Sequence, residues 1–148
     1  MEIEVLNKYA AEKFSSDKPW AAISVSTTSE QWAEIGKENR VDLLQLEFWD
    51  IDRQLEEFGI KPGTDEHKRA ILFDEDFANR VWDFVFEVKD KVEVLMIHCE
   101  AGVARSPAIA AAIEKVFTGS DDKWFKSKVP NRLVFREMLN AANKRGLI

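Results

Sequence analysis

Hydrophobic positions along the chain follow two spacings, one typical of strands and one typical of helices. Short apolar runs bounded by polar residues predict four strands, at residues 3–6, 21–26, 41–48 and 92–97. Helical spacing of apolar residues, together with capping residues, predicts helices at residues 7–14, 29–37, 75–88, 106–117 and 131–144. Because strands alternate with helices, we expect an α/β fold with a central, largely parallel sheet flanked by helices.

Two of these helices carry further signals. The helix at 106–117 is apolar on nearly every side, which predicts that it is buried and that it supports the loop before it. The helix at 29–37 is expected to place Trp32 and Ile35 on one face.

The loop before the helix at 106–117 contains Cys99, the only cysteine in the chain. Backbone N–H groups that curl around one point ahead of a helix N-terminus bind an anion, and the same field favours a thiolate. Arg105 offers a planar fork for two phosphate oxygens, and Gly102 suits a cramped loop. A lone cysteine is often only a small buried hydrophobe, but these neighbours favour a chemical role. We therefore predict a phosphate-binding loop made of Cys99, Glu100, Ala101, Gly102, Val103, Ala104 and Arg105.

Residues 98–106, HCEAGVARS, resemble the phosphate-binding signature of the cysteine-based protein tyrosine phosphatase superfamily, H-C-x-x-G-x-x-R-[ST]. The whole chain resembles the compact dual-specificity branch of that superfamily, in its bacterial or phage type. The resemblance implies a protein tyrosine phosphatase-like fold in which residues 1–148 form a single catalytic domain, with no metal or other cofactor. It also implies four roles: the nucleophile is Cys99, the phosphate clamp is Arg105, Ser106 eases the departure of Cys99, and His98 braces the loop and the thiolate.

The implied reaction needs a carboxylic acid that protonates the leaving group. In the family that the chain resembles, this acid lies upstream of the nucleophile, just after a core strand. Asp50 matches that position because it follows the strand at 41–48, and Asp52 is the alternative general acid. A carboxylate from residues 74–76 also stays open, although Asp74 is expected to be the N-cap of the next helix.

The spacing between Asp50 and Cys99 is longer than in the most compact relatives, and the extra residues lie at 53–70. This segment is mostly charged and contains a Pro-Gly turn. Two interpretations are open: a lid or recognition loop beside the pocket, or a solvated surface excursion.

The predicted function is that of a phosphomonoester hydrolase, a protein tyrosine or dual-specificity phosphatase that works through a phosphocysteine intermediate. Its partner would be a phosphorylated substrate, either a phosphoprotein or a small phosphomonoester. Two other functions stay open. One is a sulfurtransferase or arsenate-reductase-like enzyme with a similar anion loop, and the other is a non-catalytic phosphate-binding adaptor.

Composition narrows the remaining choices. The chain has 148 residues, 45% of them hydrophobic, which suits one domain with a proper core. Its net charge of -6 argues against a nucleic-acid partner and, together with Glu100 in the loop, against inositol-lipid substrates. No apolar run approaches the ~20 residues that span a bilayer, and no signal peptide is evident. We expect no membrane association and a cytoplasmic protein, and the sequence carries no signal for oligomeric state.

Overall fold

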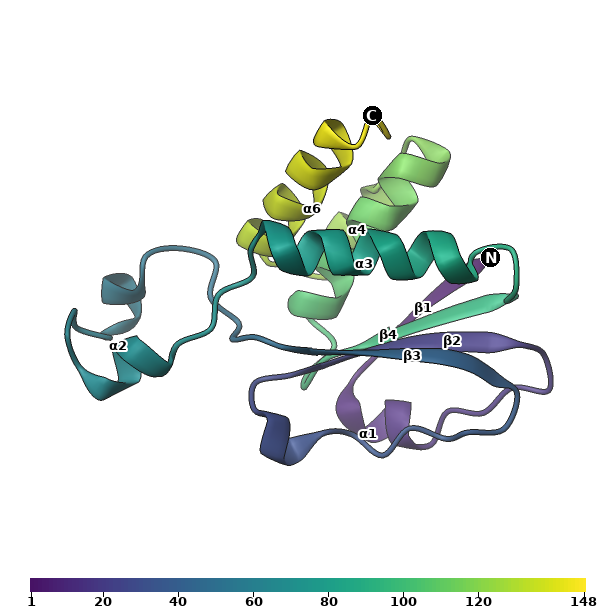
Figure 1. Cartoon of the computed structure of the whole chain (residues 1–148), viewed down its shortest axis with the longest axis horizontal. Helices are drawn as coiled ribbons and strands as arrows, with labels where there is room; N and C mark the ends of the chain where they lie inside the picture. Colours follow the sequence, from purple (N-terminus) through teal and green to yellow (C-terminus); the bar gives the residue numbers. More distant parts are fainter.

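A four-stranded parallel sheet forms the centre of the protein (Figure 1), whose computed structural model describes residues 1–148. The strands are β1 (Glu2–Leu6), β2 (Trp20–Ser26), β3 (Arg40–Glu47) and β4 (Val94–His98). They lie in the order β1-β4-β2-β3, and every neighbouring pair is parallel. The sheet confirms the predicted α/β fold and brings the carboxyl ends of its strands to one edge.

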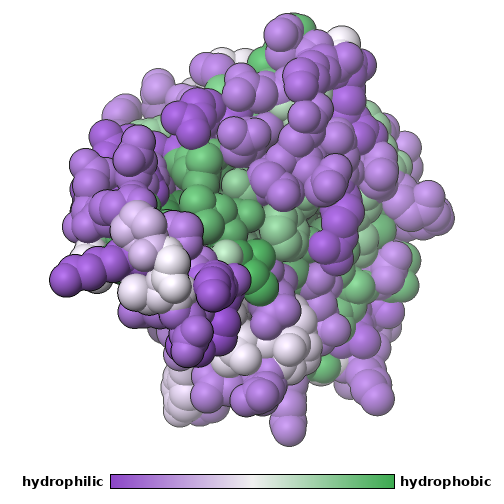
Figure 2. Space-filling view, turned by 60° about the vertical axis from the view of Figure 1, so that its left-hand side comes forward, coloured by the Kyte–Doolittle hydropathy of each residue, from purple (hydrophilic) through white to green (hydrophobic).

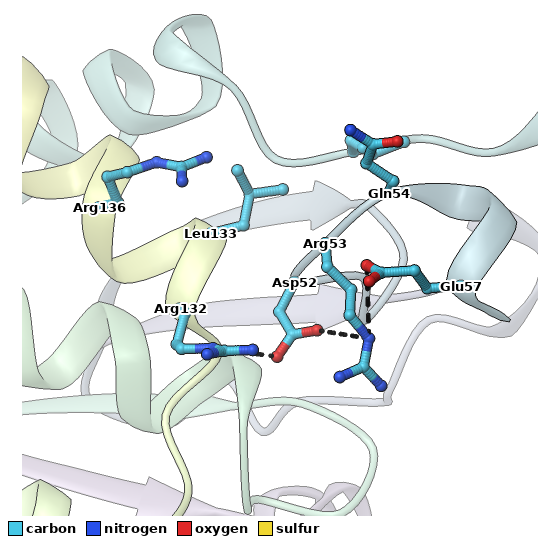
Figure 3. Close-up of a pocket in the computed structure, with 8 residues that line it drawn as sticks. Asp52, Arg53, Gln54, Glu57, Arg132, Leu133 and Arg136 are labelled. Carbon is cyan, nitrogen blue, oxygen red and sulfur yellow. Dashed lines mark ion pairs between the residues drawn. The ribbon is translucent and has the colours of Figure 1, made fainter.

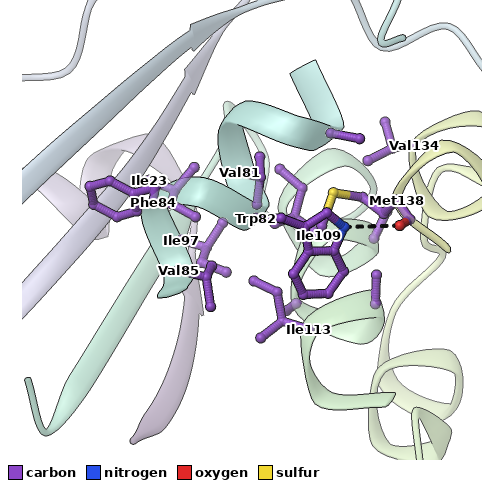
Figure 4. Packing of buried hydrophobic residues seen from close by; sticks show 14 of the residues in the cluster. Ile23, Val81, Trp82, Phe84, Val85, Ile97, Ile109, Ile113, Val134 and Met138 are labelled. Carbon is purple, nitrogen blue, oxygen red and sulfur yellow. Dashed lines mark hydrogen bonds between the residues drawn. The ribbon is translucent and has the colours of Figure 1, made fainter. Parts of the chain in front are cut away.

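Three helices cover one face of the sheet and enclose the main core: α3 (Glu75–Val88), α4 (Arg105–Thr118) and α6 (Arg132–Lys144). Trp82 of α3 lies inside this core, and its indole N–H donates to the carbonyl of Met138 in α6 at 3.0 Å (Figure 4). The first nine residues of α4 are all buried, as its apolar pattern predicted. Each large apolar side chain buried here contributes about 1.5–3 kcal/mol, so α4 is a firm support for the loop that precedes it.

The opposite face of the sheet is covered more thinly, by α1 (Lys8–Glu12) and by the chain between β2 and β3. Its smaller core consists of Ala11, Trp20, Ala22, Ala33, Ile35 and Met96. Since β2 and β4 contribute side chains to both cores, their apolar runs are continuous rather than alternating.

The predicted helix at 29–37 is wrong. Only Ser29–Gln31 turns, as the short 3-10 helix η1, and the chain is extended at Trp32. Ala33 and Ile35 are both buried in the smaller core, and the residue between them is exposed. This period of two belongs to extended chain, which covers more of the sheet per residue than a helix would.

Three short elements lie outside the main layers: η2 (Leu55–Phe58), α2 (Asp65–Arg69) and α5 (Asp122–Ser127). The first two belong to the 53–70 segment, which extends away from the sheet (Figure 1) and has mostly exposed side chains. The sequence did not predict α5, which is held by the buried Trp124. No helix has the length and apolar character that crossing a bilayer requires.

Candidate active site

The loop between β4 and α4 packs against the end of β1. Gly102 in this loop has a φ of +71°, in the left-handed region. A Cβ at this position would lie 2.9 Å from the backbone N of Asn7 and 2.9 Å from the carbonyl C of Leu6. The amide of Lys8 donates to the carbonyl of Glu100 at 3.0 Å, which ties the loop to α1. Glycine is therefore required at position 102 for both conformation and space.

Cys99 begins this loop, with 3% of its surface exposed. Its Sγ lies 3.1 Å from the Oγ of Ser106, the second residue of α4, and accepts from the backbone N–H of Gly102 at 3.3 Å. These groups and the positive end of the α4 dipole stabilise negative charge on sulfur. The sulfur of Cys99 therefore has hydrogen-bonding partners in both the loop and α4.

Arg105 is anchored by residues that directly follow two strands. Its Nη1 donates to the Oγ1 of Thr27, after β2, at 3.0 Å and to the carbonyl of Phe48, after β3, at 2.8 Å. Its Nε and Nη2 make no bond to the protein, and neither is fully buried, because no fully buried side-chain nitrogen lacks a partner. Together they form one edge of the planar guanidinium, which matches two phosphate oxygens.

His98 is buried beneath the loop, with 1% of its surface exposed. Because a carbonyl only accepts, Nδ1 donates to the carbonyl of Cys99, at 3.1 Å, and Nε2 accepts from the hydroxyl of Ser24, at 2.5 Å. Burial lowers the pKa of His98 below its ordinary value of 6.5, against the opposing effect of the bond to Cys99. The neutral imidazole therefore fixes the backbone of Cys99 rather than contacting its sulfur.

The two candidate acids lie in the loop after β3 and differ in their partners. Asp50 is exposed, and its Oδ1 accepts from the Nδ2 of Asn131 at 2.8 Å. Asp52 lies between Arg53, at 3.8 Å, and Arg132, at 3.7 Å (Figure 3). Of the two carboxylates, Asp50 is the one without a cationic partner.

The carboxylates at 74–76 lie at the N-terminus of α3. Asp74 accepts from the amide of Phe77 at 3.0 Å, as an N-cap does, and Glu75 pairs with Lys144 at 3.0 Å. None of the three lines the cleft beside the phosphate-binding loop.

That cleft, of about 460 Å³, joins the loop to the candidate acid. Val103 of the loop and Asp50 both line it, and Val129 and Phe58 add apolar walls. A neighbouring cavity of about 800 Å³ shares its arginine-rich side and extends along the start of α6 (Figure 3). Figure 2 views the molecule from nearer the side on which the 53–70 segment lies in Figure 1. A hydrophobic patch lies at the centre of this view, with hydrophilic residues around it.

Comparisons with known proteins give matches at the level of structure. No protein-family model matches the sequence, and no curated protein matches it. Human DUSP28 covers 97% of this chain over 93% of its own, with 14% identity and a TM-score of 0.58. A mouse putative dual specificity phosphatase complexed with zinc tungstate covers 95% of this chain over 84% of its own, with 15% identity and a TM-score of 0.55. The match to human tyrosine phosphatase-like serine/threonine/tyrosine-interacting protein covers 86% of this chain and 78% of that protein's chain, with 14% identity and a TM-score of 0.55.

The chain has the dual-specificity phosphatase fold. This finding confirms the resemblance to compact dual-specificity phosphatases and the fold class inferred from the sequence, and the bacterial or phage type stays a prediction. At such low identity the likeness is one of fold, so the roles of individual residues rest on the contacts described above.

Within the dual-specificity phosphatase fold of this chain, four groups at the site were missed by sequence reasoning: Thr27, the carbonyl of Phe48, Ser24 and Asn131. Two of them left a signal. Ser24 is a polar residue inside an apolar strand, and Asn131 stands at the start of a predicted helix. The other two contact Arg105 only because strand ends meet at the sheet edge.

Side chains that bind metal ions do not form a cluster in this structure. No three His, Cys, Asp or Glu side chains come together in a way that could hold a metal ion. The sulfur of Cys99 contacts the N–H of Gly102 and the hydroxyl of Ser106, groups that can donate to an anion.

Proposed function

We propose that this protein is a cysteine-dependent phosphatase, with a single catalytic domain, that removes phosphate from phosphotyrosine or from phosphorylated protein side chains more broadly. The observation that carries the proposal is the buried Sγ of Cys99, bonded to Ser106 and Gly102 at the start of α4. The anchored Arg105 and the fold support the same conclusion.

In the first step, the thiolate of Cys99 attacks phosphorus in line with the leaving oxygen. As the S–P bond forms, the P–O bond breaks, and its electron pair stays on the leaving oxygen. That oxygen takes the proton of Asp50. The loop N–H groups and the free edge of Arg105 stabilise the charge on the equatorial oxygens.

In the second step, the carboxylate of Asp50 takes a proton from water while the water oxygen attacks phosphorus. The S–P bond breaks, and its electron pair returns to the sulfur of Cys99, where the hydroxyl of Ser106 donates a hydrogen bond. Inorganic phosphate leaves, and Asp50 is again protonated for the next cycle.

The 53–70 segment takes part in substrate recognition in this proposal. Arg53 and Phe58 line the cleft that contains Asp50, so a leaving group in that cleft would touch them. The rest of the segment extends away from the sheet, where it can meet the body of a protein substrate (Figure 1).

The test is hydrolysis of p-nitrophenyl phosphate between pH 5 and 8 with a chelator present. We expect turnover by reduced wild type and loss of at least about 10⁴-fold in Cys99→Ser. Equal turnover by wild type and Cys99→Ser, or chelator-sensitive turnover, would reject the proposal.

A phosphate-binding adaptor is the second candidate. One structural neighbour is named as a tyrosine phosphatase-like interacting protein, and it shares the fold of this chain. Saturable binding of phosphopeptides by folded, reduced wild type without any hydrolysis would favour the adaptor.

A further inference from the structure

A cavity of about 800 Å³ lies beside the cleft that contains Asp50, and no step of the proposed reaction uses it. One wall is the start of the 53–70 segment, and another is the beginning of α6. The cavity and the cleft share Asp52, Arg53 and Arg132, so the two spaces adjoin. A substrate chain whose phosphorylated side chain enters the cleft can therefore place a neighbouring side chain in this cavity.

Three arginines line the cavity: Arg53, Arg132 and Arg136. About half or more of each side chain is exposed. Their ion pairs are 3.7 to 3.9 Å long, and none of the three guanidinium groups donates a hydrogen bond to the protein. Their N–H groups are therefore available to a ligand, and a planar guanidinium binds a carboxylate through two of them at once.

The charges in the cavity do not cancel. Two carboxylates line it, Asp52 and Glu57, and both contact the other two arginines rather than Arg136. The one ion pair of Arg136 is with Glu137, the next residue of α6, which does not line the cavity. One positive charge is thus left without a partner in the cavity, although the net charge of the chain is -6.

The surroundings of Arg136 suit a carboxylate on a short apolar stem. Its side chain extends from α6 beside Leu133, and Gln54 lies on the facing wall (Figure 3). Leu72 is the second apolar residue of the lining. A glutamate side chain has methylene groups that can pack on the two leucines while its carboxylate reaches the guanidinium.

We infer that this cavity binds the carboxylate of an acidic residue that flanks the phosphorylated residue of a protein substrate, and that Arg136 determines this preference. The inference rests on the proposed phosphatase function and names a class of substrate for it. A carboxylate carries one negative charge, which matches the one arginine without a partner. A phosphate dianion would leave one negative charge uncompensated, so a second phosphate group on the substrate is the poorer ligand.

The experiment uses phosphotyrosine peptides with a single glutamate placed at each position within three residues of the phosphotyrosine, and matched peptides with glutamine there. For wild type, we expect kcat/KM to be about 3- to 10-fold higher with glutamate at one or two positions. Arg136→Gln should bring this ratio to about 1, because the charge and the fork are both lost. Lys91→Gln removes the same charge just before β4, away from the carboxyl ends of the strands, and should keep the wild-type ratio.

A charge reversal guards against a loss that only reflects a damaged fold. Arg136→Glu should favour lysine over glutamine at the position where wild type favours glutamate, since the sign of the charge in the cavity is inverted. Peptides with phosphoserine at that position should give wild type no higher kcat/KM than peptides with glutamate.

The possible failures are distinguishable. A glutamate-to-glutamine ratio of about 1 at every position in wild type, or equal loss of the ratio in Arg136→Gln and Lys91→Gln, would overturn the inference, while Cys99-dependent hydrolysis of the peptides upholds the phosphatase. A preference for phosphoserine without one for glutamate would overturn the assignment of a carboxylate. Absence of Cys99-dependent hydrolysis by reduced wild type would overturn both proposals.

Discussion

The side of the site that holds the proposed nucleophile is buried and fixed by several hydrogen bonds, whereas the side that holds the proposed acid is exposed and oriented by one. Cys99 and Arg105 are 3% and 5% exposed, and each contacts at least two groups of the protein. Asp50 is exposed and accepts one hydrogen bond, from Asn131.

In the proposed mechanism, the difference follows from what each side must do. In-line attack on phosphorus requires fixed geometry, which the buried start of α4 provides. Proton transfer must reach varied leaving groups and then water, which requires an accessible carboxyl group.

The ion pairs that Asp52 makes with Arg53 and Arg132 are 3.7–3.8 Å long, and both arginines are half-exposed or exposed. Each pair therefore contributes at most about 1 kcal/mol to stability.

The largest expected effect is on the buried side. Arg105→Lys removes the planar edge and the bonds to Thr27 and Phe48, so we expect kcat/KM to fall about 10³-fold. Arg80→Lys, at an exposed position on α3, is the matched control and should retain wild-type kinetics. A similar small change in kcat/KM in both variants would show that the guanidinium of Arg105 does not bind the phosphate oxygens.

On the exposed side, Asp50→Asn should lower kcat/KM about 10²-fold, because the leaving oxygen then lacks its proton donor. Its binding of vanadate, measured by inhibition of residual activity, should be unchanged. Asp52→Asn is the matched control and should stay within a few-fold of wild type. If the larger loss falls on Asp52→Asn, the acid role moves to Asp52.

Two glycines allow the packing of the two sides to be compared through the free energy of unfolding. Gly102 and Gly63 have φ of +71° and +80°, but only at Gly102 would a Cβ meet backbone within 4 Å. Gly63→Ala should cost about 1–2 kcal/mol from conformation alone, and Gly102→Ala a further 1–3 kcal/mol, about the range for overpacking. Urea denaturation of both variants measures this difference, and equal costs would mean that the loop does not pack tightly on β1.

The smallest effect is a pH dependence from His98. Its pKa is lowered in the folded state, so below pH 6.5 the unfolded chain binds a proton that the folded chain excludes. Stability is then lost as pH falls through 6.5, with a slope of at most about 1.4 kcal/mol per pH unit from this group. His98→Asn should flatten that dependence in denaturation curves between pH 5 and 7.5, and an unchanged slope would contradict the buried neutral imidazole.

The same division explains what the sequence could predict. Cys99, Gly102, Arg105 and Ser106 are close in the chain, and a strand, a loop and a helix in succession place them together. Local spacing therefore predicted the loop between β4 and α4 and the buried helix behind it, and phosphate binding by this loop stays a prediction.

Long-range partners could not be predicted in this way. The carbonyl of Phe48 lies 57 residues from Arg105, and Asn131 lies 81 residues from Asp50. The wrong helix at 29–37 has a similar cause, because its extended form is set by the smaller core that it covers. Helix α5 depends on burial of Trp124, which its short sequence does not signal.

The most direct measurement is capture of the covalent intermediate during turnover of p-nitrophenyl phosphate. Acid quenching within the first turnover, followed by mass spectrometry of peptides, should find one phosphoryl group on Cys99. Ser106→Ala should raise its amount, because the hydroxyl that stabilises the departing thiolate is gone. Phosphate on another residue, or hydrolysis with no phosphorylated Cys99 in either protein, would contradict the account.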